Sequence, residues 1–276
     1  MRRLGFALLF VFAAGALAAA DTPQAAGKFS GKKWEFETAG AYAYPAKVGM
    51  DDEPGIRVAV SNSRFNAEII DRFWDREFVI DNRFADEQTL VVYFHFGKDG
   101  AYKGMTYSFG SGDGCGFCYD GKVRSTVKIA GGRLKGKVAL APQPDENSWD
   151  IDLDVPVAPS DYGTPLPAGG GEPGTVYATY HKAIVDNDTA ALGKVFKQGI
   201  AAKLAEHPDE VARAWREDHP TESYKVTRGF VRGDHALLLV DGATSYSKVE
   251  VEAHLVKEGN AWKIDDEVLQ VKLGGD

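Results

Sequence analysis

The sequence predicts two folded domains of different class: an N-terminal all-β domain and a C-terminal α+β domain, joined by a Pro/Gly linker. The linker, residues 156–174, is rich in proline and glycine and has no hydrophobic periodicity, so regular structure is not expected in it. Residues 29–155 contain short alternating runs between glycine turns. Residues 175–273 begin with helical spacing and end in strand patterns.

Residues 29–155 are predicted to form an antiparallel sandwich or barrel. The run 90–96 alternates but is apolar on both faces, which is typical of a central strand. A hairpin is expected over 123–140, with its turn at Gly131-Gly132. One short helix is expected near residues 66–74, where apolar residues are three or four apart.

Residues 175–273 are predicted to form three helices followed by a four-stranded antiparallel sheet. Tyr177, Tyr180 and Ile184 mark one face of the first helix, and Asp188 can cap the second. Pro208 suits the first turn of the third helix. After Pro220 the pattern changes to strands over 224–231, 236–240, 248–256 and 262–273, separated by glycine turns.

This C-terminal order resembles the nuclear transport factor 2-like superfamily, and in particular its small exported bacterial domains without an assigned activity. The resemblance lies in the opening helix 177–184 that runs through an acidic turn into 186–192, and in the final turn 256–264 with its Trp-Lys-Ile return. It implies a cone-shaped α+β fold and is compatible with a homodimer through the open face of the sheet. That fold hosts enzymes, carriers and binding modules, so no catalytic residue is transferred.

The N-terminus is typical of a cleavable secretory signal peptide, residues 1–20. Two arginines precede an apolar stretch, and small residues end at Ala20, so the mature chain is expected to begin at Asp21. The apolar stretch is shorter than the roughly 20 residues that span a bilayer, so no stable membrane anchor is expected after cleavage. The expected location is the periplasm, with secretion as the second choice.

The composition argues against several classes of binding partner. Removing two arginines with the signal peptide leaves 30 basic and 40 acidic residues, so the mature net charge is 30 − 40 = −10. A chain this acidic, without a basic cluster, is not expected to bind nucleic acid. No cofactor or metal ion is expected: the acids of residues 150–154 share a strand face but lack the spacing of a calcium loop.

Cys115 and Cys118 are the only cysteines and form a C-x-x-C motif. In an oxidising compartment their expected state is a disulfide. Their glycine-rich flanks predict a hairpin loop rather than the helix N-terminus of a thioredoxin-like site. A redox role and a metal site remain as alternatives, although a second pair of zinc ligands is not evident.

Two further groups of residues are candidates for binding. The first would line a cavity in the C-terminal domain, and the alternative is ordinary packing. The second combines aromatic and guanidinium groups, a composition common at interfaces, and the alternative is a helix that caps the sandwich. The cavity candidates are Tyr177, Tyr180, His181, Trp215 and Tyr224, and the surface candidates are Arg72, Phe73, Trp74 and Arg76. Glu250, Glu252 and His254 are expected on the solvent side of their strand.

The preferred function is an exported protein that binds an unidentified protein or a small apolar ligand, since no catalytic constellation is recognisable. One alternative is an enzyme that acts on a small hydrophobic substrate inside the cone, which requires a buried acid, His or Tyr there. Another is a thiol–disulfide protein that uses Cys115 and Cys118. Whether the chain is an enzyme stays open, with binding preferred.

Overall fold

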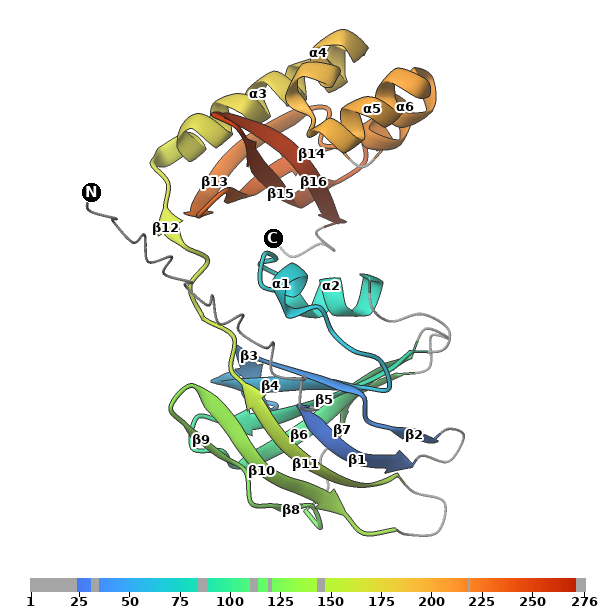
Figure 1. Cartoon of the computed structure of the whole chain (residues 1–276), viewed down its shortest axis with the longest axis vertical. Coiled ribbons are helices and arrows are strands. Elements are labelled where there is room, and N and C mark those ends of the chain that lie inside the picture. Colours follow the sequence, from blue (N-terminus) through green and yellow to red (C-terminus); the bar gives the residue numbers. More distant parts are fainter. Residues whose placement is uncertain are drawn as a thin grey trace, which may run out of the picture.

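The computed structural model describes residues 24–30, 35–83, 89–109, 114–118, 121–142, 147–217 and 219–271. Within them lie three antiparallel sheets and six α-helices (Figure 1). We call residues 24–158 the N-terminal region and residues 159–271 the C-terminal region. The predicted signal peptide, residues 1–20, lies outside the described residues. No helix in the described ranges is both long enough and apolar enough to cross a membrane.

Two sheets of the N-terminal region pack face to face as a sandwich. Phe94, Trp149 and Ile151 are among the buried residues of the shared core. One sheet has the order β3-β4-β5-β6-β7, with strands Gly40–Val48, Glu53–Ser61, Leu90–Gly97, Tyr102–Phe109 and Gly114–Cys118. The other has the order β2-β1-β11-β10-β8, with strands Glu35–Glu37, Ala25–Ser30, Ser148–Pro156, Arg133–Leu140 and Arg124–Ser125, and β9 (Lys128–Ala130) beside β10.

The outer face of the β3–β7 sheet is covered by helices rather than by water. The chain leaves the sheet after β4, forms α1 (Ala67–Ile70) and α2 (Arg76–Arg83), and returns as β5. Ile70, Val79 and Ile80 from these helices pack with Tyr93 of β5. Because one face of β5 packs on the other sheet and the opposite face packs on these helices, β5 is buried on both faces, as its sequence predicted.

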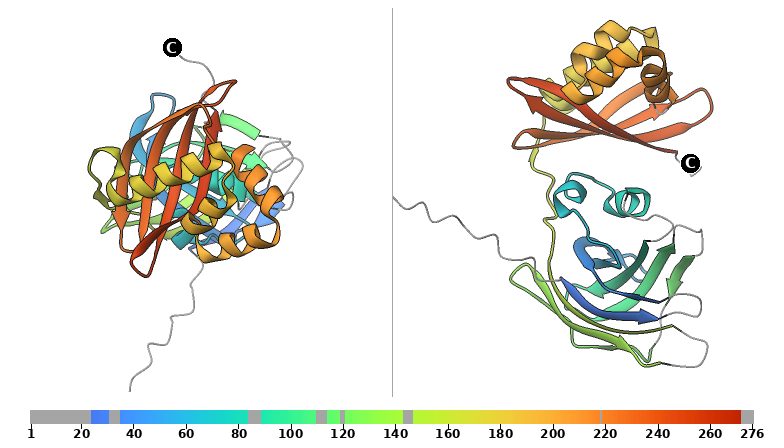
Figure 2. Two further views of the ribbon diagram at one scale, coloured as in Figure 1. Left: turned by 90° about the horizontal axis from the view of Figure 1, so that it is seen from above. Right: turned by 45° about the vertical axis from the view of Figure 1, so that its right-hand side comes forward.

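The C-terminal region places helices on one face of a five-stranded sheet of order β12-β13-β14-β15-β16 (Figure 2, left). Asp188 caps α4 as expected, because its side chain accepts a hydrogen bond from the Ala191 amide. The strands are Thr164–Pro165, Ser223–Arg232, His235–Ala243, Lys248–Glu258 and Ala261–Val271. The helices are η1 (Ala168–Gly170), α3 (Gly171–Asp186), α4 (Thr189–Val195), α5 (Gln198–Glu206) and α6 (Pro208–Glu217).

The predicted fold class is wrong in both regions. The N-terminal region is not all-β, because α1 and α2 stand between β4 and β5. Residues 78–80 of α2 are a continuous apolar run, and such a run has no helical period to recognise. The C-terminal region has four α-helices and five strands, not three helices and four strands. The additional helix α5 has one buried residue, Leu204, and the additional strand β12 has two residues inside the expected linker.

The open face of the C-terminal sheet meets α1 and α2 of the N-terminal region (Figure 2, right). Val268 of β16 belongs to the same hydrophobic cluster as Ile70 and Phe73. Glu252 and His254 of β15 are only 7% and 6% exposed, so the prediction that they face solvent is wrong. Polar residues on this strand meet another part of the chain, which strand alternation cannot reveal. The homodimer through this face stays a prediction.

Candidate functional site

The five residues predicted to line a cavity in the C-terminal region lie together in the structure. Tyr177 and Tyr180 are three residues apart on α3 and point to the same side, where both are fully buried. The ring of Tyr224 lies 5.4 Å from Tyr177 and 4.3 Å from His181. Trp215 packs edge-on against Tyr180 at 5.8 Å. These aromatic side chains contact one another, so they fill the space that they were expected to line.

A buried carboxylate that the sequence analysis missed lies among them. Glu267 of β16 accepts hydrogen bonds from the hydroxyls of Tyr177, at 2.7 Å, and Tyr180, at 2.6 Å. Nδ1 of His219 lies 2.9 Å from the same carboxylate, and both side chains are at most 2% exposed. Glu267 follows two other acids at 265–266, so the sequence contains no signal that this one is buried.

The cluster continues outward through a second imidazole. Nε2 of His219 lies 2.8 Å from Nδ1 of His181, which is partly exposed. If Glu267 accepts the Nδ1 proton of neutral His219, the free Nε2 must accept a proton from His181. Burial raises the pKa of Tyr177 and lowers the pKa of His181, so Tyr177 stays protonated and His181 favours its neutral form. We call Tyr177, Tyr180, His181, His219 and Glu267 the Glu267 cluster.

The predicted interaction surface lies between the two regions. Phe73 packs against His254 with ring centroids 4.2 Å apart and the rings tilted by 46°. Trp74 packs against Phe230 at 5.9 Å, and the Arg228 guanidinium lies over the Trp74 ring at 4.4 Å. The composition that indicated a binding surface therefore serves a contact within the chain, although this does not test binding of an external partner.

Glu252 joins the two regions by main-chain hydrogen bonds. Its two carboxylate oxygens accept from the amides of Trp74, at 3.0 Å, and Asp75, at 2.8 Å. These amides immediately precede α2, whose positive end favours a carboxylate. Nε2 of His254 lies 3.5 Å from one of the same oxygens. Glu252 is only 7% exposed, and the hydrogen-bond donors that hold its carboxylate come from the N-terminal region.

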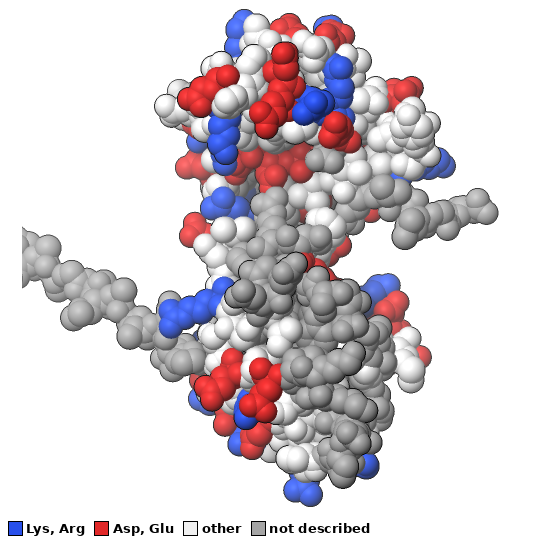
Figure 3. Space-filling model, turned by 90° about the vertical axis from the view of Figure 1, so that its right-hand side faces the viewer, with Lys and Arg blue, Asp and Glu red and all other residues white. Residues whose placement is uncertain are grey.

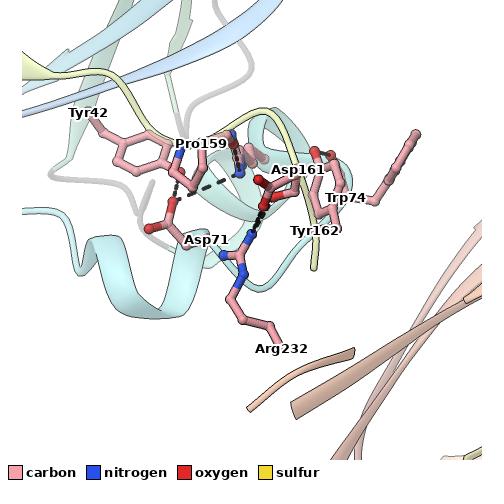
Figure 4. A network of polar contacts seen from close by, with 8 residues as sticks. Tyr42, Asp71, Trp74, Pro159, Asp161, Tyr162 and Arg232 are labelled. Carbon is pink, nitrogen blue, oxygen red and sulfur yellow. Dashed lines mark hydrogen bonds and ion pairs between the residues drawn. The ribbon is translucent and has the colours of Figure 1, made fainter. Parts of the chain in front are cut away.

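The segment between β11 and β12 is held by both regions (Figure 4). The amide of Ala158 donates to the Ala43 carbonyl at 2.8 Å, and Arg232 pairs with Asp161 at 2.9 Å. The Tyr162 hydroxyl donates to the Trp74 carbonyl at 3.0 Å, with the two rings 4.5 Å apart. The proline- and glycine-rich run therefore contains ordered contacts.

Two cavities lie between the regions, and their linings share only Tyr162. The first, which we call the Phe73 cavity, has a volume of about 530 Å³ and is lined among others by Ile69, Phe73, Leu237 and His254. The second, the Arg76 cavity, has about 490 Å³, and its lining includes Tyr44, Arg57, Trp74, Arg76 and Tyr162. Acidic and basic side chains are interspersed on the face of the molecule that the space-filling view shows (Figure 3).

Cys115 and Cys118 lie in β7, the edge strand next to β6, and not in a hairpin loop as predicted. The glycines around them favoured a turn, but β7 pairs with β6 through Tyr107 and Met105. The side chain of Cys115 lies outside the described residues, so the disulfide stays a prediction. Among the residues whose side chains are described, no group of His, Cys, Asp and Glu is arranged to hold a metal ion.

Comparison with known proteins finds a solved structure that is similar to part of this chain. It is an NTF-2-like protein of unknown function from Silicibacter pomeroyi DSS-3, 16% identical, with a TM-score of 0.27. The match covers 36% of this chain and 91% of that chain. No family model and no curated protein matches the chain. A likeness this weak carries no argument about function, and it leaves the N-terminal region unaddressed.

Proposed function

We propose that this chain is an exported binding protein that holds a small, largely apolar ligand between its two regions, in the Phe73 cavity. The observation that carries the proposal is the cavity itself, about 530 Å³ in volume with Phe73, Leu237 and Ile69 in its lining. That volume lies within the range of ordinary small-molecule sites. These apolar side chains supply the favourable burial of a ligand, at roughly 25 cal/mol per Å². Charged residues, among them Asp71, Arg72 and Lys197, also belong to the lining.

His254 supports a ligand that carries at least one hydrogen-bonding group. It lines the Phe73 cavity, and its Nε2 makes no hydrogen bond to the described residues. His235 lines the same cavity, and burial lowers its pKa, so the neutral form of its imidazole is favoured. A neutral imidazole can donate or accept one hydrogen bond without an ionic partner. We also propose that residues 175–273 belong to the nuclear transport factor 2-like superfamily. This part of the proposal is supported by the sequence features described above.

An enzyme that uses the interior of the C-terminal region is the less supported alternative. The Glu267 cluster does contain the buried acid, His and Tyr that such an enzyme requires. Its carboxylate, however, is already satisfied by three donors, and Tyr177 and Tyr180 are fully buried. The thiol–disulfide alternative depends on Cys115, whose side chain is not described.

Binding can be tested with N-phenyl-1-naphthylamine, an apolar fluorophore whose emission rises in an apolar site. We expect saturable binding to the mature chain, and a loss of at least about tenfold in affinity for Ile69→Trp, which fills the cavity. Val185→Trp is the matched control, because Val185 is 46% exposed on the outer side of α3. Equal affinity of Ile69→Trp and the natural chain, with folding intact by circular dichroism, would exclude the Phe73 cavity.

Export has an independent test. N-terminal sequencing of protein recovered from a periplasmic fraction should begin at Asp21 if the signal peptide is cleaved where its small residues end. A chain recovered from the cytoplasm with Met1 intact would contradict the proposed location without affecting the binding proposal.

A further inference from the structure

We propose that the Arg76 cavity is a second binding site, specific for a monocarboxylate with an aromatic or apolar body. The site goes beyond the function proposed above, because its lining shares only Tyr162 with that of the Phe73 cavity. Its lining comes from both regions: Tyr44, Arg57 and Arg76 from one, and Thr227, Leu239 and Val251 from the other. A ligand there would contact both.

Three buried donors of this lining lack an acceptor. Nε of Arg57 and Nε of Arg76 have no hydrogen-bond partner in the described part of the chain. The Tyr44 hydroxyl lies beside the Arg57 guanidinium, which can only donate, so the hydroxyl proton has no acceptor there. Tyr44 and Arg76 are 4% and 3% exposed. Buried donors are nearly always paired, and each one left unpaired costs about 1–3 kcal/mol. Their convergence on one cavity indicates a ligand with acceptor oxygens.

Arg76 favours an anion over a neutral acceptor. Its NH2 group donates to the Pro159 carbonyl at 2.8 Å, and a carboxylate oxygen of Asp71 lies 4.0 Å from the same group. That carboxylate also accepts from the Tyr42 hydroxyl at 2.5 Å (Figure 4). A guanidinium has five N–H donors in a planar fork that suits a carboxylate. The buried charge of Arg76 is therefore only partly compensated within the chain.

Other residues in the lining of the cavity indicate the shape and the charge of the rest of the ligand. Trp74 and Tyr162, with rings 4.5 Å apart, provide an aromatic surface for an apolar body. Asp241 and Glu250 face each other across β14 and β15 and also belong to the lining. Their negative charge disfavours a polyanion such as phosphate, which would have to lie near them. A single carboxylate on an aromatic body meets both conditions.

Isothermal titration of the full mature chain with phenylacetate, phenylacetamide and inorganic phosphate tests the site. We expect phenylacetate to bind at least about tenfold more tightly than its neutral amide, and phosphate to bind more weakly than both. Arg76→Gln should reduce phenylacetate affinity to that of the amide. Arg124→Gln is the control, because Arg124 is exposed on β8 in the other sheet of the sandwich.

Tyr44→Phe keeps the test decisive if Arg76→Gln fails to fold. It removes one hydroxyl and no packing, and we expect about a fivefold loss of phenylacetate affinity. N-phenyl-1-naphthylamine binding should not change in Tyr44→Phe, and phenylacetate binding should not change in Ile69→Trp, so failure here is distinguishable from failure of the Phe73 cavity. Equal affinity for acid and amide, or tighter binding of phosphate, would overturn the proposal.

Discussion

Glu267 and Glu252 are buried carboxylates on neighbouring strands of one sheet, and they differ in where their hydrogen-bond donors come from. In the β15–β16 register, Glu252 lies opposite Val268 and Glu267 lies opposite Ala253. The one-residue offset places the two carboxylates on opposite faces. Glu267 faces α3 and is held by side chains of its own region. Glu252 faces the N-terminal region and is held by two of its amides.

The two carboxylates therefore contribute to different processes: one to folding of the C-terminal region, the other to the contact between the two regions. The donors of Glu267 are assembled when the C-terminal region folds, so its carboxylate stabilises that fold. The donors of Glu252 are present only when the two regions are in contact, so its carboxylate stabilises their arrangement and, with it, both cavities. Since the same residue type has two roles on one sheet, substituting each glutamate should produce a different kind of loss.

The largest effect is expected for Glu267→Ala. It leaves two tyrosine hydroxyls and the His219 imidazole buried without their acceptor. Breaking a buried pair in this way costs about 3–5 kcal/mol. Urea denaturation followed by circular dichroism should show this loss in the free energy of unfolding. Glu267→Gln retains one acceptor oxygen and should lose less. A loss below about 1 kcal/mol in Glu267→Ala would show that the cluster contributes little to stability.

A smaller effect of another kind is expected for Glu252→Ala. The Trp74 and Asp75 amides lose their acceptor, at a cost of about 1–3 kcal/mol if they stay buried. Opening of the contact lets water replace the carboxylate, so limited proteolysis should accelerate in residues 159–163, while the C-terminal core keeps its stability. Lys248→Ala, at an exposed position on the same strand that lines neither cavity, is the control. Unchanged proteolysis in Glu252→Ala would mean that apolar contacts alone hold the two regions together.

The smallest effect is a pH response of the Glu267 cluster. Burial, and then the neighbouring His219, lower the pKa of His181 below 6.5 in the folded chain. The unfolded chain therefore takes up a proton first as pH falls through about 6.5, and the contribution of His181 to stability is lost below that value. An NMR titration of the His181 ring should give a midpoint below that of an unfolded peptide. Because Glu267 raises this pKa, Glu267→Gln should move the midpoint lower still. No change in the variant would show that the two groups are not coupled.

Local patterns in the sequence were sufficient for some elements. The alternation in 90–96 identified the central strand β5, and Asp188 and Pro208 identified the starts of α4 and α6. The helix α5 and strand β12 were missed because each is short and has few buried residues. Short elements of this kind are stabilised by contacts with the rest of the chain, and secondary-structure propensity does not include those contacts.

The candidate residues illustrate the same limit. The sequence proposed a cavity lined by Tyr177, Tyr180, His181, Trp215 and Tyr224, and in the structure these side chains lie together but pack against one another. Glu267 and His219, which complete the cluster, occur in an acidic run and before a proline, where neither composition nor period distinguishes them from surface residues. The composition of the second group indicated an interface, but it did not reveal which surface that group contacts. The group consists of Arg72, Phe73, Trp74 and Arg76.

The amino-acid sequence was enough to predict export, the acidic charge, the strand-rich N-terminal region and the helices-then-strands order of the C-terminal region. These properties depend on composition and on local periodicity, which can be read from neighbouring residues. The burial of Glu252 and His254, the contact of α1 and α2 with two sheets, and the cavities between the regions became visible once the chain was folded. The burial of a polar residue depends on what packs against it, and here the partner lies almost 180 residues away in the chain.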